Sequence, residues 1–302
     1  GPIRSPEERY APRPPIDLGN ARLRKLAKAL GPAYVRVSGT WANTTWYAGR
    51  SGGPQPPGFT ATLSYAQLRA LADFLKAVDS PLVTSFAGSA GSRDAHGRWQ
   101  PDQMRLFLRD ARAMGIRIAG AEFLNEPNLV AATGAPEGYT AADWGRDFGT
   151  FVRAFREEAP GALVMGPGSI GDGTLIERAA AAAGVRLLPS RDLLAAQRDP
   201  IDVFAYHYYG GVSERCATSG PLAVTPEGAT DPAWLGRTDT ALALYRGLRD
   251  QFAPGTPIWL TETGQAACGG SRWASTFADT PRYVDQLGRL AQQGVQVVMH
   301  NT

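Results

Sequence analysis

Glu122-Phe-Leu-Asn-Glu-Pro-Asn128 and Ile258-Trp-Leu-Thr-Glu-Thr-Gly264 are the two stretches from which the fold of this chain can first be inferred. Each begins as a short apolar run typical of a buried β-strand. Each also delivers one glutamate, Glu126 or Glu262, where the strand gives way to a loop. In the first stretch the strand must end at the glutamate, because the proline that follows has no amide hydrogen for ladder pairing.

Similar apolar, β-branched runs recur along the chain, with helical patterns between them. Regular alternation of this kind favours parallel βα units, and their number favours a closed barrel over an open sheet. We therefore predict an α/β fold, a (β/α)8 TIM barrel, with residues 1–302 forming a single domain. The predicted strands are Tyr34–Val37, Leu82–Phe86, Ile116–Leu124, Ala162–Gly166, Val203–Tyr209, Ile258–Thr261 and Val295–Met299, and the predicted helices are Ala21–Leu30, Tyr65–Val78, Pro101–Met114, Ala141–Ala159, Leu175–Ala183, Thr240–Phe252 and Pro281–Gln293.

The two strand-end glutamates indicate a particular chemistry. A single glutamate in such a place is usually an exposed surface residue. Two carboxyl groups from separate strand ends are what cleavage of a glycosidic bond needs, because one donates a proton to the leaving oxygen and the other attacks the sugar. The long connections 50–60 and 210–238 also follow predicted strands, on the face where barrel active sites form.

Composition excludes several other classes of protein. Of 302 residues, 43% are hydrophobic and 20% charged, and no apolar run reaches the roughly 18 residues of a membrane span. The net charge is +3 without any lysine-arginine run, so we predict no nucleic-acid partner. The three histidines and two cysteines lack metal-ligand spacing, so we expect no metal and no cofactor.

Cys216 falls in the loop after the predicted strand Val203–Tyr209, and Cys268 in the loop after the predicted strand Ile258–Thr261. They could be two separate buried thiols, since free cysteine packs well as a small hydrophobic residue. Their placement on neighbouring loops favours a disulfide. Such a bond would imply folding in an oxidising compartment, and hence a secreted or periplasmic protein.

The chain resembles glycoside hydrolase family 79, the heparanases and related β-glucuronidases, within the clan of retaining (β/α)8-barrel glycosidases. The Asn-Glu-Pro-Asn and Glu-Thr stretches are the most specific, and the order of all the matching stretches strengthens the resemblance. These stretches are Leu23–Thr40, Phe123–Asn128, His207–Tyr209, Trp259–Thr263 with Gly269 and Gly270 following, and Gly294–Met299.

This resemblance implies a role for each of several residues. Glu126 would be the general acid/base and Glu262 the nucleophile, and the substrate would be an oligosaccharide or glycosaminoglycan that contains glucuronic acid. Two further groups of residues would bind that substrate or support the nucleophile. Asn125 would hold the sugar 2-hydroxyl, Thr40 would touch the glucuronic acid, Gly269 and Gly270 would meet its carboxylate through backbone amides, Tyr208 would support the nucleophile, and Asn301 stands where some members carry glutamine.

The sequence also departs from the family pattern. Members have a barrel strand before the helix at Leu23 and a C-terminal β-sandwich. We find no convincing first strand in Gly1–Leu18, and we expect both parts to be absent from this chain. Two alternatives to a β-glucuronidase stay open: a retaining barrel glycosidase for neutral β-glycosides, and a non-catalytic glycan-binding protein of the same fold.

Overall fold

A computed structural model describes residues 14–182 and 184–301 of the chain. These residues fall into two compact units, which are described separately. The N-terminal unit comprises Ile16–Ser169 and Leu188–Val203, and the C-terminal unit comprises Ile170–Leu187 and Phe204–Thr302. In the described part of the chain, no helix is long and apolar enough to cross a membrane.

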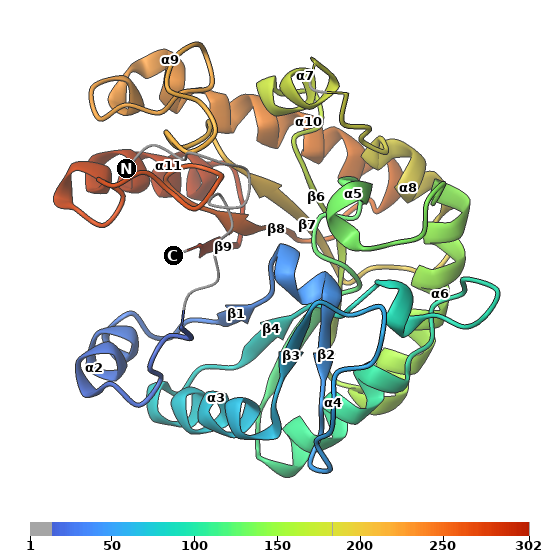
Figure 1. Cartoon of the computed structure of the whole chain (residues 1–302). Coiled ribbons are helices and arrows are strands. Elements are labelled where there is room, and N and C mark those ends of the chain that lie inside the picture. Colours follow the sequence, from blue (N-terminus) through green and yellow to red (C-terminus); the bar gives the residue numbers. More distant parts are fainter. Residues whose placement is uncertain (1–13, 183, 302) are drawn as a thin grey trace. The chain divides into compact units, whose positions relative to one another are not determined.

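Parallel strands alternate with helices through both units (Figure 1). The strands follow one another in chain order, β1-β4-β5-β6-β7-β8-β9, which is the topology of a (β/α)8 barrel and confirms the predicted fold class. The strands are β1 (Val35–Val37), β4 (Leu82–Thr84), β5 (Ile118–Glu122), β6 (Leu163–Ile170), β7 (Val203–Tyr208), β8 (Ile258–Thr263) and β9 (Val297–His300).

The helices that join these strands match the predicted helices to within a few residues. Ser64 caps α3 through a capping box, in which its hydroxyl accepts from the amide of Gln67 and the Gln67 side chain accepts from the amide of Ser64. Leu175–Ala183 was predicted as a helix, and its last residue lies outside the described part. The helices are α2 (Ala21–Ala29), α3 (Tyr65–Val78), α4 (Asp102–Ala113), α6 (Ala141–Glu158), α7 (Leu175–Ala182), α10 (Arg237–Phe252) and α11 (Thr280–Gln292).

Several short elements were not predicted. Strands β2 (Thr45–Tyr47) and β3 (Ala61–Leu63) form a separate two-stranded parallel sheet. Three short helices, α5 (Val130–Thr133), α8 (Ser190–Ala196) and α9 (Pro232–Leu235), lie in connections for which no helix was predicted.

The core of the N-terminal unit lies between β5 and α6. Helix α6 presents Phe148, Phe151 and Phe155 from one face, as the 3.6-residue period dictates. Phe123, directly after β5, stacks on Phe151 with ring centroids 5.4 Å apart. Fully buried aromatic side chains each contribute a few kcal/mol, so this cluster anchors the segment that carries Glu126.

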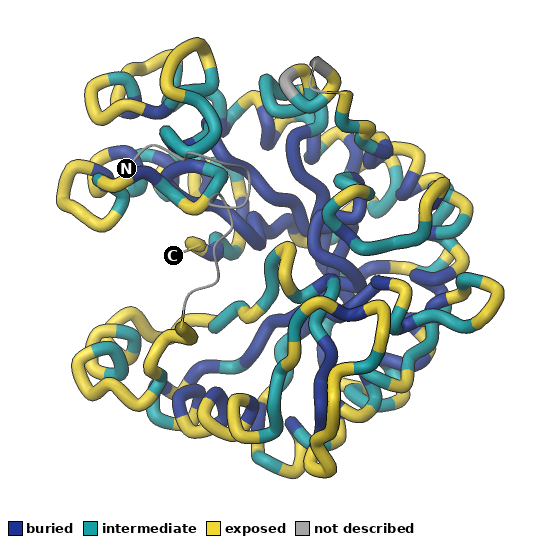
Figure 2. Tube along the Cα trace, viewed as in Figure 1, coloured by how far each residue is buried: buried dark blue, intermediate teal, exposed yellow. Residues whose placement is uncertain are grey.

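In the C-terminal unit, every residue of β7 and β8 is buried. Strands buried on both faces read as continuous apolar runs, and Val203–Tyr208 and Ile258–Thr263 have this character. Tyr206 of β7 packs on Tyr245 of α10 with ring centroids 4.8 Å apart. Figure 2 shows buried strands and exposed outer turns of the helices in each unit.

Candidate active site

Glu126 lies just beyond β5 in a tightly specified turn. The side chain is buried, with 6% of the residue exposed. The carbonyl of Glu126 accepts from the amide of Leu129 at 2.9 Å, which closes a β-turn with Pro127 at its second position. Glu126 itself has φ 52°, a left-handed conformation that side chains other than glycine rarely adopt. Such outliers cluster at functional sites, where the surrounding structure holds them.

Asn125 is held by a buried polar network. Its Oδ1 accepts from Arg36 Nη2 at 2.9 Å and from the hydroxyl of Ser38 at 3.3 Å. Because Oδ1 is committed to these donors, the amide group Nδ2 is the donor left for a ligand. Arg36 also forms a buried ion pair with Glu122 at 2.8 Å. Sequence reasoning missed Arg36, although an arginine inside an apolar strand is a signal of a buried partner.

Glu262 belongs to β8 of the C-terminal unit, and 9% of the residue is exposed. The Tyr209 hydroxyl donates to its Oε1 at 2.8 Å. That hydroxyl in turn accepts from Nδ2 of Asn301 at 2.8 Å, so the predicted residue Asn301 joins the site through Tyr209. His207 Nδ1 lies 3.9 Å from Oε2 of Glu262. The carboxylate is thus approached by a hydroxyl on one oxygen and an imidazole near the other.

The hydroxyl that supports Glu262 was expected from Tyr208, and that expectation is wrong. Successive residues of a strand face opposite sides, so Tyr208 points away from the side shared by His207 and Tyr209. Tyr208 instead lines a small cavity of about 20 Å³ with Thr238, Gln265, Arg282 and others. Burial there raises the pKa of Tyr208.

Cys216 and Cys268 form a disulfide, as predicted, with their Cα atoms 6.3 Å apart. The bond joins the loop after β7 to the loop after β8 within the C-terminal unit. Cys268, Gly269 and Gly270 are three consecutive residues with positive φ, at 63°, 79° and 70°. A Cβ placed on Gly269 would lie 3.1 Å from Arg215 Nη1, so a guanidinium adjoins the glycine pair.

Thr40, the remaining predicted contact, lies in the N-terminal unit. Thr40 is exposed at the start of the 3₁₀ helix η1 (Thr40–Thr44), directly after β1. The neighbouring Trp41 is 54% exposed, as a stacking platform for a sugar would be. Trp99, by contrast, is buried and donates its indole N–H to the carbonyl of Ala87.

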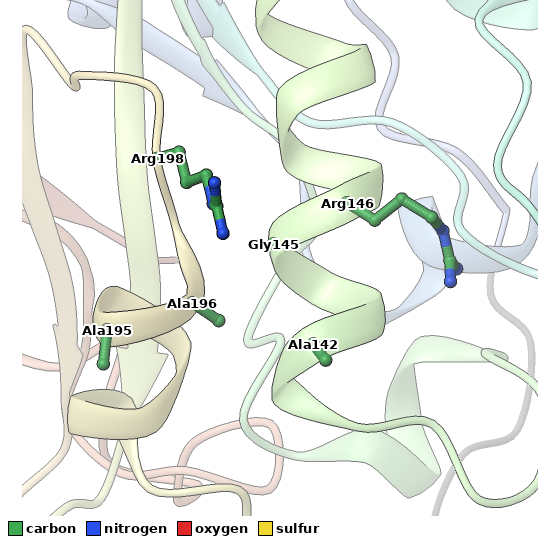
Figure 3. A pocket seen from close by; sticks show the side chains of 6 residues that line it. All are labelled: Ala142, Gly145, Arg146, Ala195, Ala196 and Arg198. Atoms are coloured by element: carbon green, nitrogen blue, oxygen red, sulfur yellow. The ribbon is translucent and has the colours of Figure 1, made fainter.

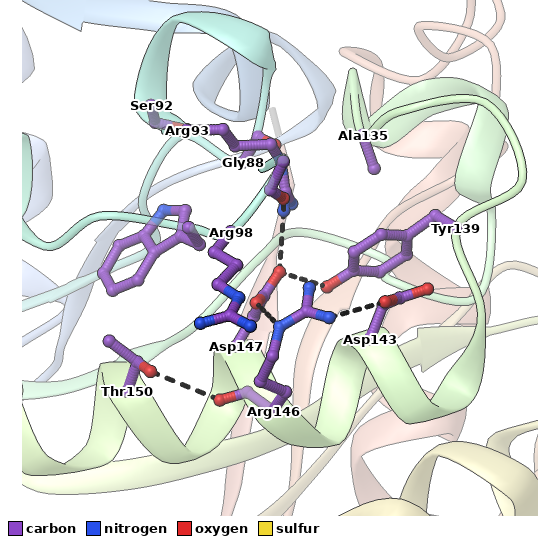
Figure 4. A network of polar contacts seen from close by, with 12 residues as sticks. Gly88, Ser92, Arg93, Arg98, Ala135, Tyr139, Asp143, Arg146, Asp147 and Thr150 are labelled. Atoms are coloured by element: carbon purple, nitrogen blue, oxygen red, sulfur yellow. Dashed lines mark hydrogen bonds and ion pairs between the residues drawn. The ribbon is translucent and has the colours of Figure 1, made fainter. Parts of the chain in front are cut away.

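A second buried network braces the loops around Glu126 (Figure 4). Arg93, in the loop after β4, pairs with Asp147 of α6 at 2.7 Å, and both side chains are 2% exposed. Tyr139, in the loop after β5, donates to the same carboxylate at 3.1 Å. Burial raises the pKa of Tyr139, so this hydroxyl remains a donor. The two loops are therefore fixed to one helix.

A groove of about 360 Å³ lies elsewhere in the N-terminal unit, between α6 and α8 (Figure 3). Helices α6 and α8 approach closely there, and the approach requires a glycine at position 145. A Cβ placed on Gly145 would lie 2.2 Å from the carbonyl oxygen of Ala196. None of the predicted site residues lines this groove.

No protein-family model matches the chain. Among curated proteins, the chain is 26% identical over 329 residues to heparanase of Mus musculus, an alignment that covers 93% of this chain and 57% of the relative. For heparanase of Rattus norvegicus the identity is 28% over 241 residues, covering 79% and 41%. For that of Gallus gallus it is 31% over 110 residues, covering 36% and 20%. The chain therefore spans less than two thirds of the length of each of these relatives.

Solved structures of glycoside hydrolases share the fold. A 4-O-α-L-rhamnosyl-β-D-glucuronidase from Fusarium oxysporum superposes with a TM-score of 0.59 at 12% identity, covering 93% of this chain and 58% of that one. A family 39 enzyme from Xanthomonas axonopodis pv. citri gives 0.56 at 17% identity, covering 93% and 54%. The resemblance seen in the sequence is confirmed: the chain is weakly but consistently similar to heparanases, and it shares the barrel fold of these solved structures.

Proposed function

We propose that this chain is the barrel of a retaining glycoside hydrolase that cleaves β-D-glucuronide linkages. The observation that carries the proposal is the environment of Glu262, a nearly buried carboxylate that accepts from Tyr209, whose hydroxyl is oriented by Asn301. A surface glutamate needs no such support. Glu126, at the end of another strand, is similarly buried and conformationally fixed. The heparanase relatives support the assignment to the glycoside hydrolases.

In the proposed mechanism, Glu262 attacks the anomeric carbon while protonated Glu126 gives its proton to the departing oxygen. The bond from sugar to leaving group breaks as the bond from sugar to Glu262 forms. Glu126, now a carboxylate, removes a proton from water as that water attacks the glycosyl-enzyme. Water thereby displaces Glu262 and restores both carboxyl groups. In this proposal the Nδ2 donor of Asn125 would hold the sugar 2-hydroxyl.

The preference for glucuronic acid over a neutral sugar rests on Arg215 and the adjoining glycines. A substrate carboxylate would be bound by the guanidinium and by backbone amides of Gly269 and Gly270, which carry no side chain to block approach. Thr40 would contact the same sugar from the N-terminal unit. A neutral glycoside could not form the charge-assisted pair with Arg215, and this is the feature that favours a glucuronide over the alternative substrate class.

The disulfide supports a place outside the cytoplasm. Disulfides persist in oxidising compartments and are rare where thiols are kept reduced. The bond between Cys216 and Cys268 lies in the loops that carry Arg215 and the glycines, so the proposed binding loops depend on it. We therefore propose that the protein is secreted or periplasmic.

Turnover of an aryl β-glucuronide beside the matching aryl β-glucoside tests the proposal. We expect cleavage of the glucuronide, its abolition in Glu262→Gln, and retained cleavage of an activated aryl glucuronide in Glu126→Ala when azide is added. Azide attacks the glycosyl-enzyme without needing a base, so it replaces the second role of Glu126. Glu137→Ala, an exposed glutamate in the same loop, is the matched control and should turn over normally.

The outcomes separate the alternatives. Preference for the glucoside would favour a glycosidase for neutral sugars. Binding of glucuronides without turnover of any substrate would indicate a non-catalytic glycan-binding protein. Full activity in Glu262→Gln would overturn the assignment of the nucleophile.

A further inference from the structure

We propose that Asn43 is a positioning residue that sets the direction of the Glu126 carboxyl group. This inference rests on the proposed function, because it assigns Asn43 to the proton transfer proposed for Glu126. Asn43 lies in η1, the turn after β1, and is fully buried at 0% exposure. Glu126 follows a different strand, 83 positions later in the sequence, and nothing in the local sequence around Asn43 indicates a link between them.

The side chain of Asn43 binds both main-chain groups of Asn125. The amide of Asn125 donates to Asn43 Oδ1 at 2.9 Å, and Asn43 Nδ2 donates to the carbonyl of Asn125 at 2.9 Å. The same Nδ2 donates at 3.1 Å to the carbonyl of Ala132, in the short helix α5 that follows the turn carrying Glu126. Oδ1 and Nδ2 thus both have partners, as burial of an amide side chain requires.

These bonds act on the peptide group that precedes Glu126. The carbonyl of Asn125 and the amide of Glu126 belong to one planar unit, so fixing the carbonyl fixes the plane from which Glu126 departs. Glu126 then takes φ 52°, a left-handed conformation that is unfavourable for a residue with a side chain. Without a clamp on this plane, the peptide can rotate to relieve that cost, and the carboxyl group would move with it.

The backbone of Asn43 ties in a third loop. Its carbonyl accepts from the amides of Gly88 and Ser89, after β4, at 3.0 and 3.2 Å. Gly134 shows how closely these segments meet, because a Cβ there would lie 2.8 Å from the Thr44 side chain and 2.9 Å from that of Ser89. Asn43 therefore joins the loops after β1, β4 and β5 at the turn that holds Glu126.

The test compares Asn43→Ala and Asn43→Asp with the unaltered protein across aryl β-glucuronides of graded leaving-group pKa. Asn43→Asp keeps the acceptor for the Asn125 amide but loses the donor to the Asn125 carbonyl, so it preserves size if the alanine variant does not fold. Thr133→Ala is the matched control, since Thr133 is buried in the same loop and hydrogen-bonds only Val130 and Ala135. Glu126→Ala marks the full loss of acid catalysis.

Misplacement of a catalytic group by about 1 Å costs on the order of 100-fold. We expect both Asn43 variants to lose about that much kcat/KM on poor leaving groups, and at most about threefold on activated ones, because kcat/KM reports the first displacement, in which only poor leaving groups need the proton. Thr133→Ala should shift all substrates by one common factor. An equal loss across the series in both Asn43 variants would overturn the inference. If Glu126→Ala itself shows no dependence on the leaving group, the acid assignment fails and the inference about Asn43 fails with it.

Discussion

At the scale of single residues, the contact between Tyr209 and Glu262 predicts the effect of removing one hydroxyl. A hydrogen bond to a charged group contributes about 1.5 to 3 kcal/mol. We expect Tyr209→Phe to lower kcat/KM by roughly 10- to 100-fold, since the lost donor orients Glu262, the proposed nucleophile. Tyr208→Phe is the control and should change kcat/KM little. Steady-state kinetics on one aryl glucuronide would show the reverse pattern if the hydroxyl of Tyr208 were the important one.

The structure places Tyr209, and not the predicted Tyr208, beside Glu262, and the alternation of side chains along β7 explains the difference. Alternation places His207 and Tyr209 on one side of β7 and Tyr208 on the other. His207 pairs in register with Glu262, and Tyr209, on the same side as His207, donates its hydroxyl to that carboxylate. The register shift between Tyr206 and His207 is not visible in the sequence. Arg215 and Asn43 gave no sequence signal, because their partners are distant in the chain.

At the scale of elements, the disulfide tethers the connection after β7 to the connection after β8. A cross-link across 52 residues stabilises by about 4 kcal/mol in the chain-entropy model. We expect the Cys216→Ser, Cys268→Ser double variant to unfold at a lower urea concentration, with a free energy of unfolding reduced by about 4 kcal/mol. Alkylation of the denatured, unreduced protein, followed by mass spectrometry, should find neither cysteine modified. Two alkylated cysteines would contradict both the bond and the proposed compartment.

The long elements could be predicted from the sequence and the short ones could not. Strands β7 and β8 and helices α3 and α6 carry periodic patterns over enough residues to be recognised. β2 and β3 have three residues each, and their pairing joins two segments within a region rich in glycine and proline. The four residues of α5 make a single turn, which is too short for periodicity to show.

At the scale of the whole molecule, the proposed mechanism predicts the stereochemistry of the product. Two successive displacements at the anomeric carbon return the starting configuration, so the first product should be β-glucuronic acid. Proton NMR of the anomeric signal during the first minutes of hydrolysis would measure this. The rate of mutarotation of added β-glucuronic acid, under the same conditions, is the control. Initial release of the α-anomer would mean inversion, and Glu262 could then not be the nucleophile.

The buried position of Asn43 also bears on protein engineering. Barrel enzymes are often diversified by exchanging one βα loop at a time, which presumes that each loop is an independent module. Here a single side chain binds the loop after β5, and its own carbonyl binds the loop after β4. Gly134 leaves no room for a bulkier graft at the same junction. The loops after β1, β4 and β5 should therefore be exchanged together. Replacing one of them alone would disturb the position of Glu126, the proposed acid.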